Sequence, residues 1–226
     1  MKVALINYTP HPDETVAAAA RLCYSPQSGE KLMENFTPGE AANLIEKLTS
    51  MGHLSPVEHI SFTFSIEGVS RVLSHQLVRH RIGVSYSQKS QRYVKEDQFE
   101  YIIPPSIQGH KESEKIFRDQ MAKIQQAYHQ LLSFVPAEDA RYVLPNATET
   151  KLVVTYNARS LHHFFQLRCC ARAQWEIRHL AELMLREVRK VAPQIFKKAG
   201  PTCITEGVCY EGAMSCGRTA NIQSRS

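Results

Sequence analysis

The chain has 226 residues, enough for one large domain or two small ones with a substantial core. Hydrophobic residues make up 43% and charged residues 22% of the sequence, which excludes a largely disordered or collagen-like protein. The formal net charge of +5 is modest, so the position of the charges along the chain tells more than their sum.

Two features of the sequence indicate the cellular compartment of the protein. The N-terminal segment has one lysine followed by only four consecutive apolar residues, which is fewer than a signal peptide requires. No apolar stretch approaches the roughly 18 residues that a membrane span needs. We therefore expect a cytoplasmic protein with no membrane partner, whose six cysteines are reduced.

The N-terminal quarter is predicted to form a strand and two helices. Residues 2–8 alternate as a strand does. Proline and aspartate at positions 12 and 13 then open a helix that reads through to about residue 24. Thr37 to Glu40 have the spacing of a capping box with proline at the first helical position, which predicts the second helix.

A second strand and helix are predicted to precede an irregular segment. Residues 59–67 alternate β-branched or aromatic with polar side chains, which is typical of a strand. Ser70 is placed to cap a helix that runs to about His80. The segment from there to Tyr93 is rich in Gly, Ser and Tyr, and we expect it to be a loop.

The rest of the chain is predicted to be mainly helical. Over residues 114–134, apolar residues recur at helical spacing, and this stripe is predicted to lie in the core: Phe117, Met121, Ile124, Tyr128 and Leu131. A short helix is expected over 137–142, a strand over 150–156, and helices over 158–170 and 173–191. The order of elements favours an α+β fold, a single domain with a central, mostly antiparallel sheet flanked by long helices.

Two segments lack acidic residues but contain several cations. Between Gly68 and Lys95 there is no Asp or Glu, but there are six basic residues: Arg71, Arg79, Arg81, Lys89, Arg92 and Lys95. Between Leu152 and Trp175 acids are absent again, while Arg159, Arg168 and Arg172 occur. Such segments favour one or more anionic ligands, without distinguishing a nucleotide from a polynucleotide or a lipid.

Some of these polar residues are predicted to face inward. Arg168 follows Leu161, Phe164 and Phe165 at helical spacing, so it shares their apolar face. Gln76 and His80 fall on the apolar stripe of the preceding helix in the same way. A buried cation needs a partner, either an acid of the same chain in a structural ion pair or a phosphate-bearing ligand, which arginine binds well.

Several motifs in a fixed order resemble a known family. The triplet R-H-R at 79–81, eight intervening residues and then S-Q-R-Y resemble the signature of the flavin-dependent thymidylate synthases. AARLCYS, HLSPVEHISFTF, ARYVLP and NARSLHHFFQLR followed by AQWEIR occur in the order that this family shows. Together the motifs cover most of residues 1–196, so the main domain is taken as 1–200 and a cysteine-containing tail as 201–226.

The resemblance implies a homotetramer of α+β subunits with active sites at the subunit interfaces. It implies methylation of dUMP at C5 to give dTMP, with 5,10-methylenetetrahydrofolate as carbon donor and NADPH reducing a bound FAD. It implies no nucleic-acid partner and no thiol nucleophile of the enzyme. Hydride would be delivered through the flavin, whose chemistry belongs to the cofactor.

The resemblance also assigns roles residue by residue. The flavin contacts that it implies are Ser55, Arg79, His80, Arg81, Asn157, Arg159 and His163, with His53 and Glu58 in the same wall. The dUMP contacts that it implies are Gln76, Arg79, Gln88, Lys89, Ser90, Gln91, Arg92, Arg141 and Arg168. The resemblance implies that Arg168 is the catalytic residue, which would stabilise charge that develops on the pyrimidine. Arg172 receives no role.

Three alternatives remain open from the residues alone. A basic nucleic-acid-binding protein would account for the pI of about 8.9 and for arginines interleaved with tyrosines. A thiolate of Cys169 or Cys170 near arginines would allow attack on the pyrimidine ring. Cys203, Cys209 and Cys216 lack the tight spacing of a zinc knuckle and a fourth ligand, so we expect a flexible or interface-packed tail and no metal.

Overall fold

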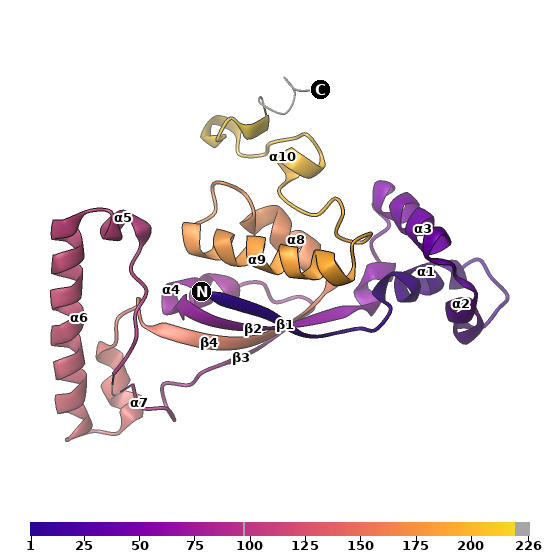
Figure 1. The fold of residues 1–226 in the computed structure, drawn as a ribbon. Helices are drawn as coiled ribbons and strands as arrows, with labels where there is room; N and C mark the ends of the chain where they lie inside the picture. The colour runs from indigo at the N-terminus through magenta and orange to yellow at the C-terminus, as the bar shows by residue number, and fades with distance from the viewer. Residues whose placement is uncertain (97, 220–226) are drawn as a thin grey trace. The chain divides into compact units, whose positions relative to one another are not determined.

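The structure, a computed structural model, describes residues 1–96 and 98–219. These residues form an α+β fold around one four-stranded sheet in the order β1-β2-β4-β3 (Figure 1). The strands are β1 (Lys2–Tyr8), β2 (Ser61–Ser70), β3 (Val84–Gln88) and β4 (Glu149–Asn157). Among the described residues, no helix is both long and apolar enough to cross a membrane.

Neighbouring strands are antiparallel throughout the sheet. From β2 to β4, Thr63 lies opposite Thr155 with hydroxyls 2.9 Å apart, whereas Gly68 donates its N–H to the side chain of Glu149. From β4 to β3, Asn157 pairs with Gly83 and Lys151 with Lys89. Residue numbers rise on one strand as they fall on its neighbour, which confirms the predicted antiparallel arrangement.

The described chain forms two compact units that share all four strands. Unit 1 comprises Met1–Lys2, Ile66–Arg79 and Ser87–Val153, and unit 2 comprises Val3–Ser65, His80–Tyr86 and Val154–Ser226, of which residues to 219 are described. These units do not test the predicted boundary between a main domain, 1–200, and a tail, 201–226, so that boundary stays a prediction.

Unit 2 contains the helices that precede and follow the sheet strands. They are α1 (Pro12–Leu22), α2 (Gly29–Asn35), α3 (Pro38–Ser50), α8 (Ala158–Arg168), α9 (Trp175–Val191) and α10 (Thr202–Thr205), with 3₁₀ turns η1 (Pro56–His59) and η3 (Gly212–Met214). Figure 1 shows α8 and α9 side by side. Their apolar faces close a core in which Phe62 packs edge-to-face on Phe196 at 5.4 Å.

Unit 1 is built around the longest helix. It contains α4 (Arg71–Leu77), α5 (Pro105–Gln108), α6 (Lys111–Leu132), α7 (Ala137–Ala140) and the 3₁₀ turn η2 (Arg141–Val143). Phe117 of α6 packs on Tyr101, with ring centroids 5.9 Å apart, and the Tyr128 hydroxyl accepts the backbone N–H of Glu96 at 3.2 Å. These two contacts fasten the segment before α5 to the helix.

Most predicted elements are confirmed, including two capping signals. Thr37 and Glu40 form the capping box of α3, and the Ser70 hydroxyl accepts the N–H of Leu73 at the start of α4. The loop expected up to Tyr93 is wrong in part, because residues 84–88 form the edge strand β3. The preceding helix ends at Leu77 rather than near His80, and α2 was not predicted.

Candidate active site

His80, the centre of the R-H-R triplet, positions a neighbouring arginine. It is half-buried and packs edge-to-face on Phe164, with ring centroids 5.0 Å apart. Its Nε2 accepts a hydrogen bond of 3.0 Å from Nε of Arg168. Burial, followed by the charges of Arg168 and His163, lowers the pKa of His80 to about 4. The imidazole is therefore neutral near pH 7 and orients Arg168 without cancelling its charge.

A tyrosine pair fixes the backbone of His80. Tyr86 donates its hydroxyl proton to the carbonyl oxygen of His80 at 2.8 Å, and the hydroxyls of Tyr86 and Tyr156 are 2.9 Å apart. Since Tyr86 uses its proton on His80, Tyr156 is the donor within the pair. Burial, then the neighbouring Tyr86, raises the pKa of Tyr156 far above its usual range. Both tyrosines are therefore uncharged, and their hydrogen bonds hold the His80 backbone in place.

Gly83 allows this loop to lie against the start of α8. Its φ of +64° is left-handed, and a Cβ there would be 2.4 Å from Nδ2 of Asn157 and 2.5 Å from Oγ of Ser160. Asn157 donates its backbone N–H to the Gly83 carbonyl at 2.9 Å, while its Oδ1 accepts the N–H of Ser160 at 2.8 Å as the N-cap of α8. Only glycine fits this position.

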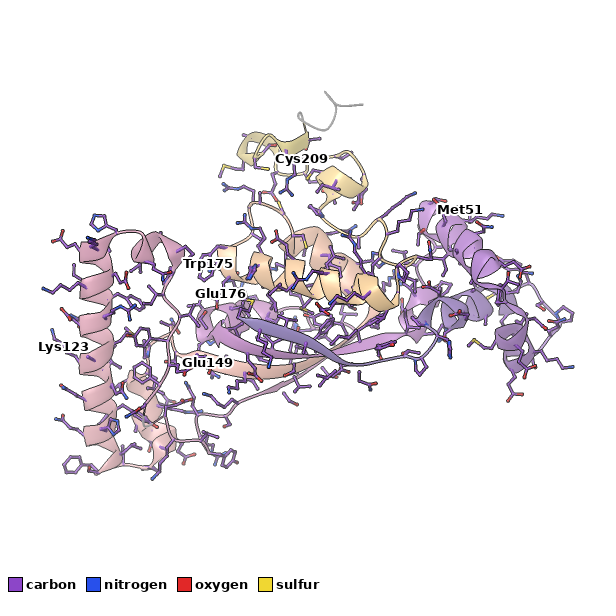
Figure 2. All side chains as sticks on the ribbon, viewed as in Figure 1. Met51, Lys123, Glu149, Trp175, Glu176 and Cys209 are labelled. Carbon is purple, nitrogen blue, oxygen red and sulfur yellow. The ribbon has the colours of Figure 1, made fainter. Side chains whose placement is uncertain are left out.

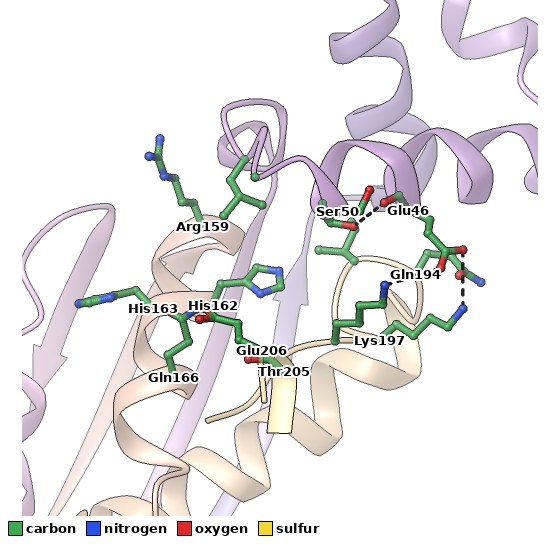
Figure 3. A pocket seen from close by; sticks show the side chains of 15 residues that line it. Glu46, Ser50, Arg159, His162, His163, Gln166, Gln194, Lys197, Thr205 and Glu206 are labelled. Carbon is green, nitrogen blue, oxygen red and sulfur yellow. Dashed lines mark hydrogen bonds and ion pairs between the residues drawn. The ribbon is translucent and has the colours of Figure 1, made fainter. Parts of the chain in front are cut away.

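A cavity of about 670 Å³ opens beside α8. Figure 3 shows His162, His163 and Gln166 of α8 on one wall, with Glu46 and Lys197 on the other. Arg159, which also lines the cavity, forms an ion pair with Glu58.

The walls of this cavity differ in character. His162 stacks on Phe196 with ring centroids 5.1 Å apart, and burial lowers the pKa of His162 to about 4. Its Nε2 is buried and has no hydrogen-bond partner among the described residues. On the other wall, Lys197 and Lys198 lie 3.8 Å from the Glu46 carboxylate, in exposed pairs that water screens. The α8 wall is thus neutral at His162 and charged at Arg159, and the opposite wall is charged.

In unit 1, the implied dUMP contacts at residues 88–92, called the phosphate cradle below, are tied to acids of the same chain. The Lys89 ammonium lies 3.0 Å from Oε1 of Glu96 and 3.5 Å from Oε2 of Glu149, and both carboxylates are buried. Gln88 donates to the Thr150 hydroxyl at 3.1 Å. The cradle therefore rests on buried ion pairs, and these pairs fix the Lys89 side chain.

The other end of the cradle is more open. Arg92 donates from Nε to Glu138 at 2.6 Å, and Arg141 donates from Nε to the Glu138 backbone oxygen at 2.9 Å. The side chains of Arg92 and Glu138 are 55% and 45% exposed, so their pair is screened by solvent. Gln91 is 7% exposed, and its Nε2 has no hydrogen-bond partner among residues 1–96 and 98–219.

Comparison with known proteins identifies the family. The family model described as thymidylate synthase complementing protein matches residues 4–194. The chain belongs to the flavin-dependent thymidylate synthase family. A flavin-dependent thymidylate synthase of Clostridium tetani is 51% identical over 240 residues, covering 99% of this chain and 96% of its own length. That of Geobacter sulfurreducens is 53% identical over 226 residues, covering 99% and 97%.

Family membership makes the chain an enzyme, and the resemblance seen in its motifs is confirmed. A relative named flavin-dependent thymidylate synthase from Sulfolobus acidocaldarius is 46% identical over 209 residues and covers 90% of this chain. Of the flavin contacts that the family implies, His80, Asn157, Arg159 and His163 lie in unit 2 around α8.

The remaining family positions are distributed between the units. Ser55 precedes η1 and is exposed, and Arg81 is exposed. Most of the implied dUMP contacts lie in unit 1: Gln76, Arg79, Gln88, Lys89, Ser90, Gln91, Arg92 and Arg141. Arg168, the implied catalytic residue, lies in unit 2. The two sets of implied contacts are thus largely divided between the units.

The structure adds ion-pair partners and two residues that the sequence did not indicate. The acid-free segments favour an anionic ligand as a partner of their cations, and in the described chain Lys89, Arg92 and Arg159 also pair with Glu96, Glu138 and Glu58. Those acids lie outside the two acid-free segments, so counting charges within the segments does not reveal these ion pairs. Sequence reasoning also missed Tyr86 and Tyr156, although the alternation V-S-Y-S-Q would have indicated a strand.

Proposed function

We propose that the chain forms dTMP by FAD-dependent reductive methylation of dUMP, with 5,10-methylenetetrahydrofolate as carbon donor and NADPH as reductant. The observation that carries this proposal is the pair between Arg168 and the neutral His80 of the R-H-R triplet. The bond from Nε to an uncharged acceptor fixes the orientation of the guanidinium, and a fixed guanidinium would stabilise an anionic reaction centre.

The α8 wall fits a flavin. The cavity of about 670 Å³ is in the size range of cofactor sites, and Arg159 and His163 line it. The buried Nε2 of His162 is a polar atom that the described chain leaves unsatisfied, as in a site that a ligand completes. When bound, the flavin would supply the hydride; Arg159, His163 and the loop at His80 would hold and orient it.

The unit 1 cradle fits the phosphate and sugar of dUMP. Gln91 offers a buried amide donor without a partner among the described residues, and the Ser90 hydroxyl accepts the Arg92 N–H at 3.2 Å. A phosphate dianion would compete well with Glu138 for Arg92, because that pair is exposed and weak. Lys89 would offer N–H donors from a fixed position, while Glu96 and Glu149 balance its charge.

Arg168 would act on the pyrimidine ring. Its guanidinium, held at Nε by His80, would face negative charge as that charge develops at N3 and O4 of the uracil. Tyr86 and Tyr156 would keep the His80 backbone in place, and therefore act as positioning residues. In this arrangement Arg168 would act as a fixed positive charge, without transferring a proton.

The thiol state of Cys169 supports a mechanism without an enzyme thiolate. Burial raises the pKa of Cys169 to about 12, so it is a neutral thiol at physiological pH. It is 5% exposed and packs as a small apolar side chain. We therefore propose that Cys169 does not attack the pyrimidine, and the family resemblance implies no nucleophilic role for Cys170 either.

We propose a homotetramer with the active sites at subunit interfaces. The α6 helix leaves Ile116 59% exposed and Phe117, Ile124 and Leu131 only half-buried, which suits a helix covered by another subunit. A homotetramer would also bring flavin contacts of one subunit to dUMP contacts of another. Nucleic acid and membranes have no part in this proposal.

Anaerobic tritium release from C5-labelled dUMP tests the function, with FAD, folate and NADPH omitted one at a time. Arg168→Lys should lower tritium release by at least about 100-fold while flavin absorbance is retained. Arg172→Lys is the matched control, because Arg172 is an exposed arginine in the turn between α8 and α9; it should leave the rate unchanged. A colourless protein that takes up no flavin, or an Arg168→Lys variant with full activity, would overturn the proposal.

A further inference from the structure

Two buried carboxylates hold the lysine of the phosphate cradle. Glu96 and Glu149 are buried, and the Lys89 ammonium lies 3.0 Å from Oε1 of Glu96 and 3.5 Å from Oε2 of Glu149. Two carboxylates outweigh one ammonium, so through charge alone this group of side chains would repel a phosphate. Any contribution of the two acids to phosphate binding must therefore come from geometry.

Glu149 joins the cradle to two strands. It is the first residue of β4 (Figure 2), and its backbone N–H donates to the Glu100 carbonyl at 2.8 Å. Its Oε1 accepts the N–H of Gly68 in β2 at 2.9 Å, while its Oε2 faces Lys89. One carboxylate thus links β2, β4 and the cradle, with a separate oxygen for each of its two partners.

The conformation of Gly68 permits this link. Its φ of +69° is left-handed, and a Cβ there would be 3.2 Å from the backbone nitrogen of Met1. Glycine meets both demands, and a glycine inside a strand commonly marks a local departure from the regular ladder. The Glu149 side chain supplies the acceptor for the N–H at this point of β2.

Glu96 joins the cradle to α6. Its backbone N–H donates to the hydroxyl of Tyr128, a side chain of α6 with 0% exposure, at 3.2 Å. Its Oε2 accepts from the Lys89 ammonium at 3.3 Å. Lys89 is also fixed at its backbone, because its N–H donates to the Lys151 carbonyl of β4 at 2.9 Å. All of these residues belong to unit 1, so the network lies within one unit.

Stability alone does not favour charged groups at these buried positions. Desolvation of an ammonium and two carboxylates opposes folding, and apolar side chains of similar size often stabilise a protein at least as much as a buried ion pair does. What such a network fixes is one arrangement of the backbone and side chains that carry it. Here that arrangement includes Gln91, whose buried Nε2 has no hydrogen-bond partner among the described residues.

We propose that Glu149 and Glu96 are positioning residues for the phosphate of dUMP. They act through Lys89, which keeps its third N–H for the ligand, and they hold residues 88–92 in the shape that receives the phosphate. The inference rests on the proposed function, because it takes the cradle to bind dUMP. Neither acid contacts the nucleotide in this arrangement, and neither takes part in the chemistry at Arg168.

The affinity of Glu149→Gln for dUMP separates geometry from charge. The amide keeps an oxygen for the Gly68 N–H, and Lys89 keeps Glu96 as its counter-ion. Charge alone predicts tighter dUMP binding, because a carboxylate has been removed. We expect the opposite: in anaerobic tritium release, KM for dUMP should rise at least about tenfold while kcat stays within about threefold.

Two other variants complete this comparison. Glu96→Gln should raise KM for dUMP in the same way, because it also loosens Lys89. Glu100→Gln, at an exposed acid nearby in the chain, is the matched control and should keep the KM of the unaltered chain.

Two further measurements distinguish positioning from a purely structural role. In calorimetry, Glu149→Gln should bind dUMP more weakly but bind deoxyuridine, which lacks the phosphate, like the unaltered chain. The combination of Lys89→Met, Glu96→Leu and Glu149→Gln should unfold at the same denaturant concentration as the unaltered chain or at a higher one. A structural role predicts a lower midpoint and equal weakening of both ligands, and either result would overturn the inference.

The same experiments separate this inference from the proposed function. If the unaltered chain neither binds dUMP nor releases tritium, the proposed function fails and the inference fails with it. If the unaltered chain binds dUMP, and Glu149→Gln and Glu96→Gln bind it equally well or more tightly, the inference alone is refuted.

Discussion

The two long helices, α9 of unit 2 and α6 of unit 1, have similar patterns and different surroundings. Over 17 residues, α9 buries a continuous stripe: Ile177, Leu180, Ala181, Met184, Leu185 and Val188. Over 22 residues, α6 has two buried side chains that the structure describes, Met121 and Tyr128. A helical apolar pattern thus predicts that a face will be covered, but it does not say by what.

Of the five α6 residues predicted to lie in the core, some are buried in the single chain and the others are only half-buried. Burial of Met121 and Tyr128 confirms the prediction for those residues. It is wrong for Phe117, Ile124 and Leu131, which are only half-buried in the single chain. The α9 stripe is covered by its own unit, whereas the α6 stripe has apolar surface left for another partner, and a neighbouring subunit is the one we propose.

The largest expected effect is in the α9 core. Leu180→Ala removes a side chain with 0% exposure and leaves a cavity, so the free energy of unfolding should fall by about 2 to 5 kcal/mol. Chemical denaturation monitored by circular dichroism measures it. A loss below about 1 kcal/mol would contradict the assignment of α9 to the core.

A charge on the α6 stripe should act on assembly instead. If α6 lies at a subunit interface, Ile124→Asp should shift the proposed tetramer to smaller species in light scattering. Association should weaken roughly 5- to 30-fold, because a carboxylate would be buried between subunits. Lys123→Asp, whose side chain leaves α6 at an exposed position (Figure 2), is the control and should assemble normally. If Ile124→Asp unfolds a monomer instead, the stripe belongs to the core of its own unit.

The pH dependence of stability should come largely from unit 2. The pKa values of His80 and His162 are lowered to about 4, whereas the unfolded chain binds protons near pH 6.5. Between those values the unfolded state holds more protons at these two histidines, so their contribution to the free energy of unfolding should decrease as the pH falls from 6.5 to 4, by at most about 1.4 kcal/mol per pH unit per proton. Burial raises the pKa of Asp13 to about 6, so Asp13 contributes in the opposite direction below pH 6 and offsets part of this slope. Above pH 6.5 these two groups should contribute no slope.

Two variants assign that slope by denaturation at several pH values. His162→Phe keeps the stack on Phe196 and removes the titrating nitrogen, so its slope should be flatter. His59→Gln, at an exposed histidine, should keep the slope of the unaltered chain. If the free energy of unfolding changed equally with pH in all three proteins, the pKa of His162 would not be lowered by its burial.

The smallest effect is expected on the outer face of α9. Lys190 pairs with Glu187 at 2.6 Å in an i, i+3 arrangement, and its side chain is 60% exposed. Lys190→Gln should change the free energy of unfolding by less than about 0.5 kcal/mol, and added salt should remove the difference. A larger, salt-resistant loss would show that this face is covered after all.

Elements with local signals were predicted well, whereas the edge strand β3, whose local signal is weak, was not. The capping residues Thr37 and Ser70 marked where α3 and α4 begin, because a cap acts within three or four residues. The strand β3 is short and its pattern was outweighed by serine and glycine nearby; pairing with β4 decides its conformation.

The same contrast explains what could be predicted of the site. The implied contacts His80 and Arg168 came from motifs, but the hydrogen bond between them joins residues 88 positions apart. The acids that pair with Lys89 and Arg92 are likewise distant or follow the acid-free segment, so no local charge count identifies them. The assigned ligand roles stay predictions.

The division into units limits how the chain can be cut into fragments. Each strand crosses a boundary, at Lys2/Val3, Ser65/Ile66, Tyr86/Ser87 and Val153/Val154, and a fifth boundary at Arg79/His80 splits the R-H-R triplet. No single cut of the gene yields either half intact. Fragments, domain exchanges and transplanted modules would each sever backbone ladders, so recombination with relatives should succeed only when whole chains are kept together.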